Sequence, residues 1–169
     1  MSAMTLKEVT RRFVTGNRSF PAVDNVSLTV RRGQRLALVG PSGSGKTTLL
    51  NLMGALDRPD GGTVQCLGVE LSTASERKAA DFRRKHLGFV FQQDALVPEL
   101  TVHENVELPL VLLREDAAMR RETVDELLKA LGLSQNARAY PGALSAGEKQ
   151  RVAVARAVVH SPGILLADE

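Results

Sequence analysis

A glycine-rich stretch that joins an apolar run to a helix-forming run carries the residues best suited to chemistry. It matches the pattern G-x-x-x-x-G-K-[ST] at Gly40, Pro41, Ser42, Gly43, Ser44, Gly45, Lys46 and Thr47. The glycines let the backbone turn its N–H groups toward an anion, and without a Cβ they allow a polyphosphate to approach closely. The ammonium of Lys46 suits the β- and γ-phosphates, the hydroxyl of Thr47 suits Mg²⁺, and Thr48 can donate one further hydrogen bond. The pattern predicts a phosphate-binding loop, and therefore nucleotide binding.

A second candidate site is an acidic pair that follows an apolar run. Residues 164–167 read Ile-Leu-Leu-Ala and precede Asp168 and Glu169. In Mg²⁺-nucleotide chemistry, Asp168 is suited to hold the metal ion, and Glu169 is suited to polarise the water that attacks the γ-phosphate. The same pair at the start of a helix or turn is the alternative interpretation.

The elements around the phosphate-binding loop are predicted from periodicity. Residues 36–39 form an unbroken apolar run and predict a buried parallel strand, and residues 47–55 predict a helix with Leu49, Leu50 and Met53 inward. Alternating patterns at 5–9 and 26–30 predict half-exposed antiparallel strands on either side of a polar loop, with a turn at 16–19. After a turn at 56–62, residues 63–67 predict a strand that returns to this antiparallel layer.

The second half of the chain is predicted to be mainly helical. A helix at 74–85 and a strand at 87–91 come first, and we expect a helical lobe over about 95–143. Within it, Thr101 and Glu104 form a capping-box pattern, the helix is expected to bend or end near Pro109, and a helix over 114–131 is capped by Gly132. A further helix runs from 144 to about 159, and a buried strand follows at 164–167.

Length, charge and composition limit the classes of protein to which this chain can belong. The chain has 169 residues, 43% hydrophobic and 24% charged, which is enough for one sizeable core. The formal charge is +3 with arginines concentrated near the N-terminus; a solvated basic face is the favoured interpretation over nucleic acid or an anionic membrane surface. A single cysteine, Cys66, excludes an internal disulfide and a cysteine zinc cluster and fits a reducing compartment. No apolar run approaches the length needed to span a bilayer, so another chain would supply the membrane part of any membrane process.

Together these motifs resemble the ATP-binding subunit of ABC transporters over essentially the whole chain. The resemblance rests on the phosphate-binding loop, on FVFQ at 89–92, on LSAGEKQRVAVARA at 144–157 and on ILLADE at 164–169, in the order of the family. LSAGE resembles the LSGGQ signature, with Ala146 and Glu148 as tolerated changes. The resemblance implies an α/β fold: a P-loop NTPase core of ABC type with a parallel sheet, an N-terminal antiparallel β layer and an inserted helical lobe, in a single domain over 1–169.

The resemblance also implies roles for individual residues. Phe13 resembles the aromatic residue that stacks on adenine, and Gln92 resembles the glutamine that reaches the metal ion and the attacking water. Ser145 and Gly147 resemble the signature residues that contact the γ-phosphate of ATP bound by the opposite subunit, and a simple capping box of Ser145 with Glu148 is compatible with that role. These roles make ATP and Mg²⁺ the expected ligands. Thr47, Gln92 and Asp168 would hold the metal ion, while Lys46, Gln92 and Glu169 would act in catalysis.

Within the family, the sequence looks most like the subunits of lipoprotein-release, macrolide and antimicrobial-peptide export systems. This implies a homodimer that meets a transmembrane permease through the region around Gln92 to Leu100, at the cytoplasmic face of the cell membrane. The family continues after the catalytic glutamate with a further strand and a switch histidine. The histidines here are His86, His103 and His160, so we expect a longer protein that was truncated after Glu169.

Two alternative functions stay open at this point. The first is a noncatalytic nucleotide-binding fragment. The second is a nonmembrane ABC ATPase acting on nucleic acid or ribosomes, which is disfavoured because only one phosphate-binding loop is present and no long coiled-coil insert lies between Lys46 and Ser145. Direct binding of nucleic acid is not expected.

Overall fold

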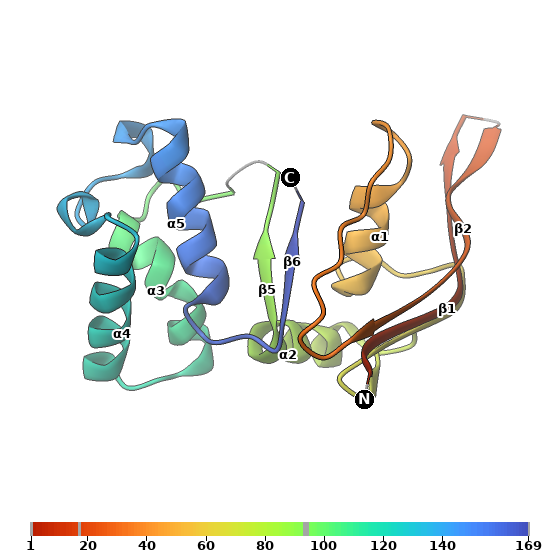
Figure 1. Ribbon diagram of the computed structural model, residues 1–169, viewed down its shortest axis with the longest axis horizontal. Helices are drawn as coiled ribbons and strands as arrows, with labels where there is room; N and C mark the ends of the chain where they lie inside the picture. The colour runs from red at the N-terminus through yellow and green to blue at the C-terminus, as the bar shows by residue number, and fades with distance from the viewer. Residues whose placement is uncertain (1, 17, 93–94, 169) are drawn as a thin grey trace. The chain divides into compact units, whose positions relative to one another are not determined.

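The computed structural model describes residues 2–16, 18–92 and 95–168. The chain divides into two compact units, unit 1 over residues 1–83 and unit 2 over residues 84–169. Figure 1 shows the elements of both units along the chain. Within the described residues, no helix has both the length and the apolar character that crossing a membrane requires.

Unit 1 is built on an antiparallel sheet in the order β2-β1-β3-β4. The strands are β1 (Ser2–Thr15), β2 (Arg18–Arg31), β3 (Gly61–Cys66) and β4 (Val69–Glu70). β3 pairs with β1 as predicted, with Leu6 opposite Val64. The prediction of a polar loop between the first two strands is wrong. Instead, β1 and β2 form one long hairpin in which Phe13 lies opposite Phe20. Contacts between aromatic side chains on opposite strands stabilise the hairpin even where the neighbouring residues are polar.

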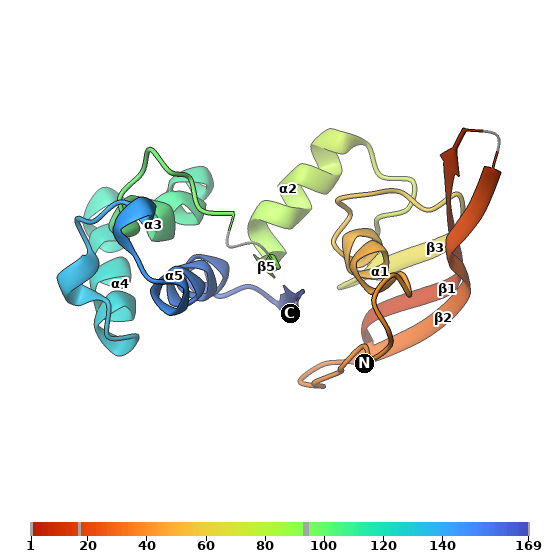
Figure 2. The same cartoon turned by 90° about the horizontal axis from the view of Figure 1, so that it is seen from above.

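The core of unit 1 lies between this sheet and helix α1 (Lys46–Met53). Leu6 of β1 and the alternate residues Val64 and Cys66 of β3 point inward, and a register shift of β1 between Leu6 and Val9 brings Val9 to the same core, so that all four are fully buried. α1 contacts β1, β2 and β3, and Figure 2 shows it beside these strands. Leu52 and Met53 are the buried residues of α1. Met53 was predicted to point inward, whereas Leu49 and Leu50, also predicted inward, are only half-buried.

The predicted buried strand at residues 36–39 is also wrong. Residues 34–40 form no strand, and the side chains of Leu36 and Val39 are 43% and 89% exposed. An apolar run becomes a strand only when a neighbouring chain segment pairs with its backbone N–H and C=O groups. No sheet of the described residues includes this segment as a member.

Unit 2 contains a parallel pair of strands, as the sequence predicts. β5 (Leu87–Val90) pairs in register with β6 (Ile164–Ala167), Leu87 opposite Ile164 and Val90 opposite Ala167. β6 is not buried throughout, because Leu166 is buried while Leu165 is 49% exposed. A parallel strand is buried on both sides only when both faces of its sheet are covered. Helix α2 (Glu76–His86), predicted from its charged pattern, leads into β5.

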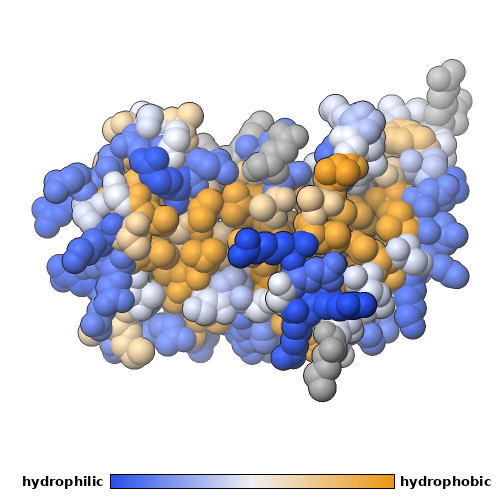
Figure 3. Space-filling model, viewed as in Figure 1, coloured by the Kyte–Doolittle hydropathy of each residue, from blue (hydrophilic) through white to orange (hydrophobic). Residues whose placement is uncertain are grey.

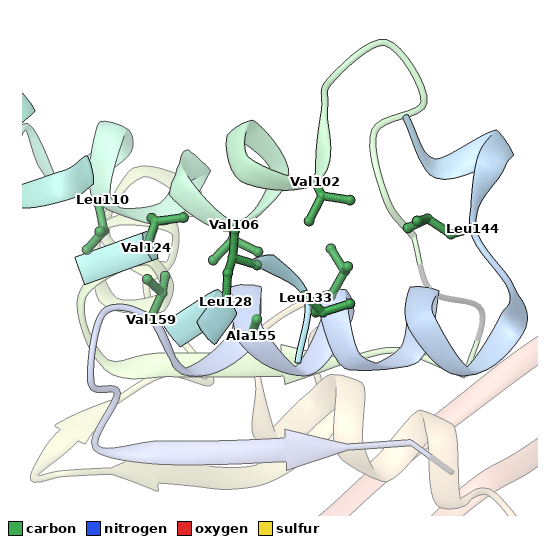
Figure 4. Close-up of a cluster of buried hydrophobic side chains, with 10 residues drawn as sticks. Val102, Val106, Leu110, Val124, Leu128, Leu133, Leu144, Ala155 and Val159 are labelled. Atoms are coloured by element: carbon green, nitrogen blue, oxygen red, sulfur yellow. The ribbon is translucent and has the colours of Figure 1, made fainter. Parts of the chain in front are cut away.

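Three helices form the core of unit 2: α3 (Val102–Leu113), α4 (Ala117–Ala130) and α5 (Ala146–Val158). Two short 3-10 helices, η1 (Ser134–Asn136) and η2 (Pro141–Ala143), connect them. Figure 4 shows the buried cluster that these helices share: Val102, Val106, Leu110, Val124, Leu128, Leu133, Leu144, Val152, Ala155 and Val159. Apolar surface is also visible over α5 in Figure 3, consistent with the half-buried side chains of Val154 and Val158.

The caps of these helices match the sequence, and of the two outcomes predicted at Pro109, a bend or an end, the helix does not end there. The Thr101–Glu104 capping box is present, and Gly132 takes a positive φ of 68° directly after the C-cap of α4. α4 begins after Asp116, whose carboxylate caps it, rather than at Arg114. Pro109 lies inside α3, which continues to Leu113. Proline removes one backbone hydrogen bond, and the burial of Val106 and Leu110 on either side keeps the helix continuous.

Candidate functional site

The glycine-rich loop of unit 1 leads directly into α1. The side-chain amine of Lys46 donates to the carbonyl oxygens of Gly40 and Pro41, both at 2.9 Å, so the loop curves around the amine. Gly45 is the N-cap of α1 and offers no side-chain cap to the first N–H groups of the helix. Uncapped N–H groups and the positive end of the helix dipole favour an anion at this position. Lys46 adds a full positive charge to the same loop.

Two glycines of this loop are required by its backbone. Gly43 and Gly45 have φ values of 78° and 88°, in the left-handed region that other residues rarely adopt. At Gly45 space is also limiting, because a Cβ would lie 2.0 Å from the carbonyl oxygen of Ala22 in β2. The loop is therefore held close against β2, and any side chain at residue 45 would displace it.

The remaining loop residues surround this turn. Ser44 donates its backbone N–H to Pro41 O at 3.3 Å, which closes the turn. Ser42, Ser44 and Thr47 have exposed side chains, and Thr48 is half-buried at the start of α1. The structure thus brings together all predicted residues from Gly40 to Thr48 in one loop. The hydroxyls of Ser42, Ser44 and Thr47 are accessible to a ligand.

Phe13 lies in unit 1 on β1, near the turn of the hairpin. Its side chain is 37% exposed, and its ring faces the ring of Phe20 with centroids 6.4 Å apart. The guanidinium carbon of Arg11 lies 5.1 Å from the centroid of the Phe13 ring. Sequence reasoning missed Arg11, because residues 10–25 were expected to form a loop, whereas in a strand Arg11 and Phe13 lie on the same face.

Gln92 and Asp168 lie in unit 2 at the carboxyl edge of the parallel pair. β5 ends at Val90 and β6 at Ala167, which are register partners, and Asp168 donates its N–H to Val90 O at 2.9 Å. Parallel strands bring the residues that follow them to one edge of a sheet. Gln92 and Asp168 therefore both follow strands that end at this edge, and Gln92 is exposed. Glu169 lies outside the described residues.

Ser145 and Gly147 lie at the start of α5. Ser145 is the N-cap, and its N–H and hydroxyl donate to the carboxylate of Glu148 at 2.8 and 2.6 Å. Asn136 donates a further hydrogen bond to Glu148 at 3.1 Å, a contact that the sequence did not indicate. These hydrogen bonds stabilise the carboxylate and lower the pKa of Glu148, and the bond from the Ser145 hydroxyl has the largest effect. The capping box is thus present, and Gly147 is exposed in the first turn.

The predicted metal ligands carry oxygen donors. Gln92 and Asp168 of unit 2 carry an amide oxygen and a carboxylate, and Thr47 of unit 1 carries a hydroxyl, all of the kind that Mg²⁺ prefers. Within residues 2–16, 18–92 and 95–168, no group of three or more histidine, cysteine, aspartate or glutamate side chains could hold a metal by itself.

The fold is that of the P-loop NTPase core of ABC type. A family model described as ABC transporter matches residues 23–169, and the chain belongs to this family. In solved structures, the dimeric ATP-binding cassette MJ0796 bound to ADP and Pi superimposes with a TM-score of 0.94 at 40% identity, over 98% of this chain and 73% of that one.

Among curated relatives, several are named as exporters. The probable syringafactin export ATP-binding/permease protein SyfD of Pseudomonas syringae is 42% identical over 166 residues, and the macrolide export protein MacB of Burkholderia pseudomallei is 44% identical over 166 residues. The ABC transporter ATP-binding protein YvrO of Bacillus subtilis is 40% identical, over 98% of this chain and 72% of the relative. The aligned region includes 98% of this chain but only 25% of the length of SyfD and of MacB. It corresponds to the ATP-binding part of such proteins.

Proposed function

We propose that this chain binds Mg-ATP and hydrolyses it as a dimer to drive an export-type ABC transporter. The observation that carries the proposal is the loop at 40–47, where the Lys46 amine and the uncapped start of α1 converge. A triphosphate would replace the two loop carbonyls as the partner of the amine. Backbone N–H groups of the loop and the hydroxyls of Thr47 and Thr48 would complete the contacts with phosphate and metal.

The proposed roles of the other residues follow the family motifs. Phe13 would stack on the base, and Thr47, Gln92 and Asp168 would supply oxygen ligands to Mg²⁺, which would neutralise charge on the phosphates. Gln92 would also reach the attacking water, and Glu169 would polarise it. The position of Gln92 and Asp168 after strands that end at one sheet edge supports a shared role.

The proposed dimer places the start of α5 against the nucleotide of the partner subunit. Ser145 and Gly147 would contact the γ-phosphate there, so ATP would join the two subunits and hydrolysis would separate them. The dimeric cassette MJ0796 supports dimerisation by similarity, and the export ATP-binding/permease proteins MacB and SyfD support a permease partner. A transmembrane permease would bind the region around Gln92 to Leu100, which holds the protein at the cytoplasmic face of the membrane.

Equilibrium binding of Mg-ATP to the full chain tests the proposal. Lys46→Ala should weaken binding at least tenfold, about 1.4 kcal/mol, because the charge beside the phosphates is lost. The matched control is Lys78→Ala, since Lys78 is an exposed lysine of α2 outside the loop, and it should leave the affinity unchanged. Equal affinities for wild type and Lys46→Ala would contradict the proposal.

A second measurement separates the ATPase from a noncatalytic nucleotide-binding module. Hydrolysis of ATP should be detectable and should be lost in Glu169→Gln, while binding of ATP stays. Binding without any hydrolysis by the wild-type chain would favour the noncatalytic function.

A further inference from the structure

We propose that Arg11 is a positioning residue for the nucleotide base, which holds the Phe13 ring in place and ties it to the helix of the phosphate-binding loop. The inference rests on the proposed function, because it assumes that Phe13 contacts the base. It adds a residue that neither the sequence motifs nor the comparisons single out.

Arg11 is held by two carboxylates of the turn that precedes β3. Its Nε donates to Asp57 Oδ2 at 2.8 Å, and its Nη1 donates to Asp60 Oδ1 at 2.9 Å. The Arg11 side chain is 24% exposed, so these charge-assisted hydrogen bonds are partly shielded from water. Asp60 is fixed in turn by the Arg12 N–H at 2.6 Å, and its own N–H donates to Thr10 O at 2.8 Å. The guanidinium therefore has one well-defined position.

The position of the guanidinium defines that of the Phe13 ring. The guanidinium carbon lies 5.1 Å from the ring centroid, within the range of a cation–π contact. Phe20, the cross-strand partner, contacts the ring with an interplanar angle of 46°. Both contacts restrict rotation of an aromatic side chain that is 37% exposed. A ring already restricted loses less conformational entropy when a base stacks on it.

The turn that holds Arg11 is also tied to α1. The backbone N–H groups of Leu56 and Asp57 donate to Asn51 O in α1, at 2.9 and 3.3 Å. Arg11 thus connects the strand that carries Phe13 with the helix that begins at Lys46. This connection sets the distance between a stacked base and the phosphate-binding loop, so Arg11 should matter for ligands that have a base and not for those that lack one.

Comparing Mg-ATP with Mg-tripolyphosphate tests the inference, because tripolyphosphate has no base. Arg11→Met should weaken ATP binding about two- to fivefold, the range of an exposed cation–π contact, and leave tripolyphosphate binding unchanged. The matched control is Arg12→Met, since Arg12 is the exposed neighbour on the same strand, and it should change neither affinity. Arg11→Lys keeps the charge but not the two-pronged geometry, and it should give an intermediate loss for ATP alone.

A double-mutant cycle with Phe13→Ala distinguishes positioning from a general structural role. If Arg11 acts through the ring, Arg11→Met should add no further loss of ATP affinity once the ring is removed. Equal losses for ATP and tripolyphosphate in Arg11→Met and Arg11→Lys, or full additivity with Phe13→Ala, would overturn the inference. Failure of the proposed function would give a different result. In that case the wild-type chain would bind neither ATP nor tripolyphosphate in a way that depends on Lys46.

Discussion

Replacing Asn105 tests how the first turns of α3 hold the segment that precedes the helix. The side chain is fully buried, and its amide makes four contacts with the backbone. Oδ1 accepts the N–H of Val97 at 2.8 Å, while Nδ2 donates to the carbonyl oxygens of Val97, Leu100 and Thr101 at 3.0, 2.9 and 3.0 Å. One side chain therefore satisfies the backbone of residues 97–101, part of the region proposed to meet the permease.

The expected loss of stability follows from the backbone groups that Asn105→Ala leaves without hydrogen-bond partners. The Val97 N–H loses its acceptor and the half-buried carbonyl of Leu100 loses its donor, and each such group costs about 1–3 kcal/mol. Because water can reach part of the segment, we expect a total loss of about 3 kcal/mol in the free energy of unfolding. Asn105→Asp should cost at least as much, since a carboxylate cannot donate and would face three carbonyl oxygens.

Urea unfolding followed by circular dichroism measures these losses from the shift in midpoint. Asn136→Ala is the matched control, because Asn136 donates one side-chain hydrogen bond, to Glu148 at 3.1 Å, and should cost about 1 kcal/mol. A loss for Asn105→Ala within about 1 kcal/mol of wild type, or equal to that of Asn136→Ala, would refute the reasoning. It would mean that residues 97–101 keep their structure without the amide.

Three further predictions concern packing and titration. Burial raises the pKa of Cys66 to about 12, so iodoacetamide at pH 8 should alkylate this thiol only in urea; rapid labelling of the folded protein would contradict its burial. Gly88→Ala should cost about 3 kcal/mol of stability, because a Cβ would lie 2.1 Å from a carbonyl oxygen of α5, whereas Gly142→Ala, with no atom within 4 Å, should be neutral in the same urea assay. The capping-box hydrogen bonds lower the pKa of Glu104 and of Glu148 below 4.5, so their stabilisation is complete above that pH and lost as the pH falls through the lowered values. Replacing both by glutamine should flatten the acid side of the stability profile, and an unchanged profile would show that other carboxylates dominate it.

Local signals in the sequence were sufficient for the elements that depend on neighbours along the chain. The capping boxes at Thr101 and Ser145, the glycine at 132 and the strand at β5 follow from residues within a few positions of one another, and the structure confirms them. The family was identified in the same way, because its motifs are short and ordered, and the family match confirms it. The roles of the individual site residues and the domain boundaries stay predictions.

The errors fall where pairing or packing between distant segments decides the outcome. The apolar run at 36–39 has strand propensity but no partner strand among the described residues, and the polar segment at 10–25 lacks a clear strand pattern but pairs with itself as a hairpin. At Pro109 the sequence allowed either a bend or an end of the helix, and packing of the buried residues around it keeps α3 continuous to Leu113.

The sequence by itself determined the family and the caps of helices α3, α4 and α5, because both depend on the identity and spacing of neighbouring residues. The tertiary structure alone decided that Arg11 lies between the Asp57–Asp60 turn and the Phe13 ring, and that the Asn105 amide supports residues 97–101. The contacts of Arg11 with Asp57 and Asp60 join residues 46 and 49 positions apart in the chain, and those of Asn105 depend on how residues 97–101 fold back on α3. Hydrogen bonds and ring contacts depend on distances of a few ångströms, which only the folded backbone establishes.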